Sequence, residues 1–128
     1  MADQPVMLIT GASSGIGAET ARAAAKQGYR LVLAARSEDK LKGLQQELGG
    51  EETVLTVQCD VQSGDDQKNM VDQALKTFGR IDAVFANAGR GGEPGGFSGA
   101  DPDVWKDMIL TNIYGVGLTL QHCMPALK

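Results

Sequence analysis

Four short apolar runs, separated by longer helix-like stretches, are the feature that most constrains the fold of this sequence. Runs of this length predict parallel strands buried on both faces, because such strands read as continuous rather than alternating apolar segments. The predicted strands are VMLIT (Val6–Thr10), RLVLAA (Arg30–Ala35), VLTVQ (Val54–Gln58) and AVFA (Ala83–Ala86).

The stretches between the runs have the periodicity of amphipathic helices, and a glycine follows each of them, as is common at helix ends. The first three predicted helices are Ile16–Gln27, Ser37–Leu48 and Gln67–Phe78, followed by Gly28, Gly49 and Gly79. A fourth helix is predicted to begin at Asp101 or Pro102 and to run toward Pro125. Alternating strands and helices predict an α/β fold with a parallel sheet, whose ligands bind beyond the carboxyl ends of the strands.

Composition narrows the kinds of partner. With 128 residues, one domain is expected, and a net charge of -4 without a basic cluster argues against nucleic acid. No apolar run approaches the ~20 residues of a membrane span, and MADQPVMLIT lacks the features of a secretion signal. We therefore expect a cytoplasmic protein with reduced thiols at Cys59 and Cys123 and a small-molecule ligand. No metal site is expected, because the single histidine, His122, has no partners at metal-ligand spacing.

The segment TGASSGIG, Thr10–Gly17, joins the first predicted strand to the first predicted helix. Glycines in such a turn permit a tight bend, close approach of a ligand and close helix-to-strand packing, and the helix N-terminus suits a pyrophosphate. No lysine follows Gly17, which excludes a P-loop, whereas a merely structural turn stays an alternative. The predicted contacts are Gly11, Ser13, Ser14, Gly15, Ile16 and Gly17.

TGASSGIG closely resembles the T-G-x-x-x-G-x-G motif of the short-chain dehydrogenase/reductase family, in its classical subgroup. The resemblance covers the whole chain and is reinforced by three further motifs. It implies a doubly wound, Rossmann-type parallel sheet with strand order 3-2-1-4. It also implies an oxidoreductase that moves hydride between a nicotinamide cofactor and an alcohol or ketone.

The second motif is LVLAARS, at the end of the second predicted strand. An NAD site would place Asp or Glu here to bind the ribose 2′-hydroxyl, but Ala35 and Arg36 stand instead. Arg36 can bind a 2′-phosphate through its guanidinium fork, and the resemblance implies NADP rather than NAD, with Ser37 assisting. The alternative is a solvated Arg36 beside a Ser37 that only caps the next helix.

The remaining motifs, CDV and NAG, follow the third and fourth predicted strands. The resemblance implies that Asp60 accepts from the adenine amino group and that Val61 lines the ring pocket. It also implies that Asn87, Ala88 and Gly89 stabilise the sheet beside the adenosine ribose. A helix cap or Asx-turn is the alternative for Asp60, and a plain turn is the alternative for NAG.

In the fourth predicted helix the amide of Asn112 stands in an otherwise apolar stripe with Met108 and Val116, which we expect to face the sheet. The resemblance assigns Asn112 to the catalytic tetrad, held in a locally distorted helix so that its main-chain carbonyl binds a water of the proton relay. A purely structural asparagine is the alternative. The glycine-rich loop before this helix, GRGGEPGGFSGAD, is expected to border the substrate cleft.

The chain departs from the family pattern in one respect. The family's catalytic Ser and Tyr-x-x-x-Lys pair lie beyond the tetrad asparagine, whereas Tyr29 and Tyr114 are followed four residues later by Leu33 and Leu118. We therefore expect residues 1–128 to be one NADP-binding domain, inactive alone and homo-oligomeric, from an enzyme whose second half lies outside this sequence. A naturally short, non-catalytic dinucleotide-binding or regulatory module is the alternative.

Overall fold

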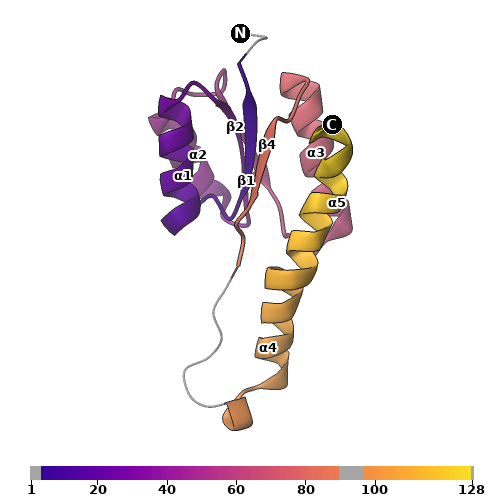
Figure 1. Cartoon of the computed structure of the whole chain (residues 1–128). Helices are drawn as coiled ribbons and strands as arrows, with labels where there is room; N and C mark the ends of the chain where they lie inside the picture. The colour runs from indigo at the N-terminus through magenta and orange to yellow at the C-terminus, as the bar shows by residue number, and fades with distance from the viewer. Residues whose placement is uncertain (1–3, 90–96, 128) are drawn as a thin grey trace.

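A four-stranded parallel sheet in the order β3-β2-β1-β4 forms the centre of the molecule (Figure 1). The computed structural model describes residues 4–89 and 97–127. The strand order and the four predicted strand ranges are confirmed. The strands are β1 (Val6–Thr10), β2 (Arg30–Ala35), β3 (Val54–Gln58) and β4 (Ala83–Ala86).

Both faces of the sheet are covered, which explains why the strands read as continuous apolar runs. Leu8 and Val32 pack on the face of α3 (Gly64–Phe78) and α5 (Val116–Leu127). Ile9 and Leu33 point to the other face, toward α1 (Gly15–Lys26) and α2 (Glu38–Glu47). Alternate residues of each central strand therefore belong to two separate hydrophobic clusters, one on each face of the sheet.

The boundaries of the first three helices lie close to the predicted ranges, except at the start of α3. Helices α1 and α2 begin and end within one residue of the predicted ranges. Helix α3 begins at Gly64 rather than at the predicted Gln67, because Ser63 caps it by accepting a hydrogen bond from the Asp66 N–H at 3.1 Å.

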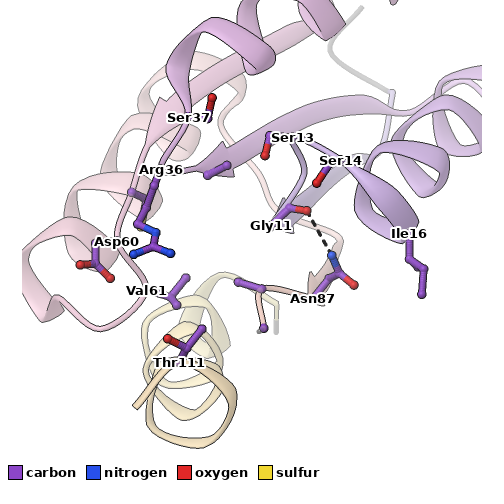
Figure 2. Close-up of a pocket in the computed structure, with 14 residues that line it drawn as sticks. Gly11, Ser13, Ser14, Ile16, Arg36, Ser37, Asp60, Val61, Asn87 and Thr111 are labelled. Carbon is purple, nitrogen blue, oxygen red and sulfur yellow. Dashed lines mark hydrogen bonds between the residues drawn. The ribbon is translucent and has the colours of Figure 1, made fainter. Parts of the chain in front are cut away.

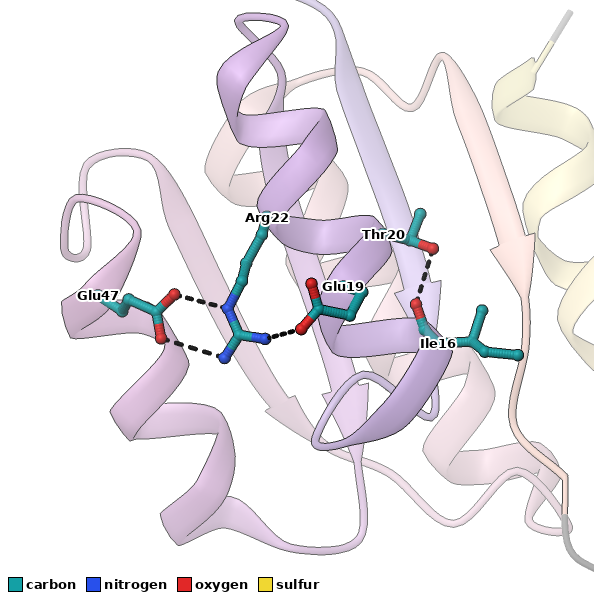
Figure 3. A network of polar contacts seen from close by, with 5 residues as sticks. All are labelled: Ile16, Glu19, Thr20, Arg22 and Glu47. Atoms are coloured by element: carbon teal, nitrogen blue, oxygen red, sulfur yellow. Dashed lines mark hydrogen bonds and ion pairs between the residues drawn. The ribbon is translucent and has the colours of Figure 1, made fainter.

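Helices α1 and α2 are also joined at their outer surface (Figure 3). Arg22 of α1 donates from Nε to Glu47 of α2 at 2.6 Å and from Nη1 to Glu19 at 2.5 Å. The hydrogen bond from Arg22, together with its charge, keeps the pKa of Glu47 below its ordinary value. The network connects the outer surfaces of two helices whose buried faces pack on the same side of the sheet.

The predicted fourth helix is a continuous helical rod with a distorted centre. Helix α4 (Pro102–Ile109) begins at Pro102, within the prediction, and Asp101 caps it by accepting a hydrogen bond from the Asp103 N–H at 2.9 Å. A π-helical segment, η2 (Leu110–Gly115), then leads into α5, and α4 extends past the carboxyl ends of the strands (Figure 1). A short 3-10 helix, Phe97–Gly99, precedes the rod. Residues 90–96 of the glycine-rich loop lie outside the described residues, so its relation to a substrate cleft stays a prediction.

The expectation that Met108, Asn112 and Val116 form the buried stripe of this rod is wrong. Asn112 is exposed, and the rod instead buries Thr111, Gly115, Thr119 and Cys123. The stripe is not visible as an apolar pattern because it consists of small and hydroxyl residues whose polar atoms are paired with side chains of α3 and of the turn before it. Within the described ranges, no helix is long and apolar enough to cross a membrane.

Candidate functional site

A cavity of about 600 Å³ lies at the carboxyl ends of the strands, where the fold predicts a ligand (Figure 2). Most of the residues predicted to bind a cofactor line it. They are Gly11, Ser13, Ser14, Ile16, Arg36, Ser37, Asp60, Val61, Asn87, Ala88 and Gly89. Gly15, Gly17 and Asn112 do not line this cavity.

The glycines of the turn after β1 serve different purposes. Gly11 has a φ of 63°, and a Cβ placed on it would lie 2.7 Å from the Ala88 Cα. A Cβ on Gly17 would collide with the Gly11 carbonyl and lie 2.7 Å from Asn87 Nδ2, so Gly17 lets α1 pack closely against the turn. Gly15 has open space around its Cβ position.

The turn after β4 holds the glycine turn in place. Asn87 donates from Nδ2 to the Gly11 carbonyl at 3.2 Å, and the Ala88 N–H donates to Thr10 Oγ1 at 3.1 Å. These bonds join the ends of two neighbouring strands. One wall of the cavity is thus held together by hydrogen bonds between the two turns.

The serines of the cavity leave their hydroxyls available to a ligand. Ser14 and Ser37 occupy the N-cap positions of α1 and α2, yet neither side chain makes a capping hydrogen bond. The alternative reading of Ser37 as only a helix cap therefore has no capping bond to support it in the described structure. Together with the positive end of the α1 dipole, these hydroxyls make the wall suitable for an anion.

Arg36 directly follows β2, the strand that pairs with β1, so it lies at the same edge of the sheet as the glycine turn (Figure 2). Its side chain is exposed and has no ion pair among the residues that the structure describes. Gln58 fixes its main chain by donating from Nε2 to the Arg36 carbonyl at 3.2 Å. The site therefore presents an exposed cation where an NAD site would carry a carboxylate.

Asp60 and Val61 form the wall that follows β3. Asp60 Oδ1 accepts from the Gln62 N–H at 3.0 Å, so the Asx-turn considered as the alternative is present. That bond uses one carboxylate oxygen, and within the described residues the other is available to a ligand. Val61 is buried and supplies an apolar surface beside it.

The cavity is also lined by three residues that were not predicted from the sequence: Ala35, Cys59 and Thr111. Each directly precedes a predicted site residue, which is the only signal that could have found it. Burial, with a smaller effect of the Asp66 and Asp60 charges, raises the pKa of Cys59 to about 12. The thiol is therefore neutral and serves as an apolar wall rather than as a nucleophile.

Asn112 lies near the site but outside the cavity. It belongs to the π-helical segment η2, which agrees with the distorted helix that the resemblance implies. Its Oδ1 would lie 3.0 Å from a Cβ on Gly89, so its side chain lies against the end of the turn after β4. No group of three or more His, Cys, Asp or Glu side chains in the described ranges could hold a metal ion.

The sequence of this chain is similar to that of known short chain dehydrogenases. Residues 5–128 match the family model of the short chain dehydrogenases. Short chain aldehyde dehydrogenase 1 of Euphorbia lathyris is 37% identical over 118 residues, which cover 91% of this chain and 41% of that protein.

Two solved structures superpose closely on this fold. An actinorhodin polyketide ketoreductase with NADPH has a TM-score of 0.91 at 33% identity, covering 98% of this chain and 48% of that one. A 3-ketoacyl-(acyl-carrier-protein) reductase from Brucella melitensis, complexed with NADH, has a TM-score of 0.92 at 30% identity. The match covers 98% of this chain and 51% of that one. The chain spans about half the length of these relatives. The motifs, the sheet and a family match over nearly the whole length show that the chain belongs to the short-chain dehydrogenase family.

Proposed function

We propose that this chain is the cofactor-binding part of an NADP(H)-dependent oxidoreductase that acts on an alcohol or carbonyl compound. The observation that carries the proposal is that the glycine turn, Arg36 and Asp60 line the same cavity. Membership of the family supports the oxidoreductase class. Because the similar structures contain NADPH in one case and NADH in another, the choice of NADP rests on Arg36.

The residues around the cavity fit such a dinucleotide in their chemistry. The glycine turn, Ser13 and Ser14 offer N–H and O–H donors and a helix N-terminus to a pyrophosphate. Arg36 and Ser37 offer a cation and a hydroxyl to a 2′-phosphate. The remaining walls suit adenosine: Asp60 can accept from the adenine amino group, Val61 can cover the ring, and Asn87, Ala88 and Gly89 can border the ribose.

When bound, the nicotinamide cofactor supplies the hydride of the reaction. This chain binds and orients the cofactor, and the main-chain carbonyl of Asn112 is proposed to hold a water of the proton relay. Neither tyrosine of this sequence has a lysine four residues later, so the proton donor that the family uses is not among these 128 residues. The complete reaction therefore requires residues outside this sequence.

Calorimetric titration of the 128-residue chain with NADPH and with NADH tests the proposal. Because only NADPH has a 2′-phosphate to hydrogen-bond with the Arg36 guanidinium, we expect NADPH to bind at least about tenfold more tightly than NADH. Equal affinities would contradict the choice of NADP, and the absence of binding by either cofactor to the folded chain would contradict the function.

A further inference from the structure

Gln67 of α3 is fully buried, and both ends of its side-chain amide are hydrogen-bonded. Its Nε2 donates to the Val61 carbonyl at 3.0 Å and to the Gly115 carbonyl at 3.1 Å. Its Oε1 accepts from Thr119 Oγ1 at 3.0 Å. One side chain thus connects the turn after β3 to the helical rod.

The orientation of this amide is determined by its partners. Two main-chain carbonyls can only accept, so the amide nitrogen with its two protons must face them. The oxygen then faces the Thr119 hydroxyl, which is buried and has one proton to donate. An apolar residue at position 67 would remove the hydrogen bonds to the Val61 carbonyl, the Gly115 carbonyl and the Thr119 hydroxyl. The Thr119 hydroxyl also lies 3.0 Å from the Gly115 carbonyl and can donate to it, so the Val61 carbonyl is the group that loses its side-chain partner outright.

The two segments that Gln67 joins both bear on the site. Val61 lines the cavity, and Gly115 ends the π-helical segment η2 that contains Asn112. The segments are in close contact, since a Cβ on Gly115 would lie 2.8 Å from Val61 Cγ2.

Gln62 makes a second connection between the turn and the rod. Its Nε2 donates to Asp107 Oδ1 at 2.7 Å and to Thr111 Oγ1 at 2.9 Å, and Thr111 lines the cavity. Gln62 is only partly buried, whereas Gln67 is enclosed, so the connection through Gln67 is the one that water cannot replace.

We propose that Gln67 is a positioning residue: it holds the π-helical segment against Val61 and thereby sets the affinity of the cavity for the adenosine half of the cofactor. The inference rests on the proposed function, because it concerns the same cavity. It adds that part of the cofactor affinity comes from a residue that does not line the cavity.

Gln67→Leu tests this role, with Gln45→Leu as a matched control. Gln45 is a buried glutamine of α2 whose Nε2 donates to the Val54 carbonyl at 2.8 Å, and it belongs to the opposite face of the sheet. Hydrogen–deuterium exchange is measured over residues 110–119, and affinity is measured with 2′-phospho-ADP-ribose. Gln67→Leu should accelerate exchange in this segment about tenfold and weaken binding about five- to tenfold, while Gln45→Leu changes neither.

A milder variant, Thr119→Val, removes the hydroxyl that Gln67 accepts from and should give the same pattern with smaller changes, even if Gln67→Leu does not fold. Unchanged exchange over residues 110–119, equal acceleration in Gln45→Leu, or faster exchange with unchanged affinity would overturn the inference. Failure of the proposed function gives a different result, because the unmodified chain then does not bind 2′-phospho-ADP-ribose. In that case hydrogen–deuterium exchange over residues 110–119 still shows whether Gln67 holds the π-helical segment in place.

Discussion

Asn87 Nδ2 donates a hydrogen bond of 3.2 Å to the main-chain oxygen of Gly11, across 76 residues of sequence. The bond connects the turn after β4 to the glycine turn after β1, and both residues line the candidate cavity. Asn87 therefore stabilises the site and the sheet together.

Asn87→Asp should lower the free energy of unfolding by about 1–3 kcal/mol, because a carboxylate cannot donate and would face a carbonyl oxygen. Dinucleotide binding should weaken as well, since the glycine turn loses its support. Urea denaturation measures the first effect and titration the second. Asn69→Asp is the control: Asn69 is exposed and accepts from Gln73 through Oδ1, which aspartate also provides. Equal stability losses in the two variants would contradict this account.

The sequence predicted the sheet well because its strands are buried on both faces, so that Val6–Thr10 and Arg30–Ala35 stand out as apolar runs. It also indicated most of the cavity, because Arg36 and Asp60 directly follow such runs. The residue pattern alone does not indicate the π-helical segment, since a spacing of four residues is read as an ordinary helix, and only the family resemblance implied a distortion at Asn112. The buried stripe containing Thr111 was missed for a related reason: its burial depends on hydrogen bonds to Gln62, 49 residues away in sequence.

The close packing at Gly17 predicts opposite outcomes for two glycine-to-alanine substitutions in helices. Gly17→Ala should destabilise the fold and weaken dinucleotide binding, because the new Cβ would meet the Gly11 carbonyl and Asn87 Nδ2. Gly43→Ala should stabilise it by about 0.5–1 kcal/mol, because Gly43 lies in α2 with nothing within 4 Å of its Cβ position. Thermal unfolding and titration of both variants check this. A stabilised Gly17→Ala with unchanged affinity would refute the packing role.

The buried thiols predict a loss of stability in alkaline solution. Burial raises the pKa of Cys59 to about 12 and that of Cys123 to about 11, above the ordinary value of 9.0. Above about pH 9 the unfolded chain therefore loses thiol protons that the folded chain keeps, so the free energy of unfolding falls as pH rises. Between about pH 8 and pH 10, the urea midpoint should fall more steeply for the unmodified chain than for a variant carrying Cys59→Ala and Cys123→Ala. Parallel slopes would show that the thiols are not protected.

The 128-residue chain is expected to self-associate and to show no ketone-dependent oxidation of NADPH. In the described sheet β4 pairs with β1 on one side only, and Ile109, Ile113, Leu120 and Met124 are exposed along the helical rod. Light scattering should give a dimer or larger species, and Ile109→Lys should shift it toward the monomer. A monodisperse monomer that oxidises NADPH in the presence of a ketone would contradict both expectations.

The role of Arg36 is tested most directly by the affinities for 2′-phospho-ADP-ribose and ADP-ribose, which differ only in the 2′-phosphate. Arg36→Asp is compared with Lys40→Asp, an exposed position of α2 with the same change of charge that does not line the cavity. We predict that the unmodified chain binds 2′-phospho-ADP-ribose more tightly than ADP-ribose. Arg36→Asp should weaken the binding of 2′-phospho-ADP-ribose by roughly 1.5–3 kcal/mol and leave the binding of ADP-ribose unchanged. Lys40→Asp should have little effect on either affinity. Equal weakening of both ligands by Arg36→Asp, or no binding of either ligand to the folded chain, would contradict the central claim that this cavity binds NADP(H).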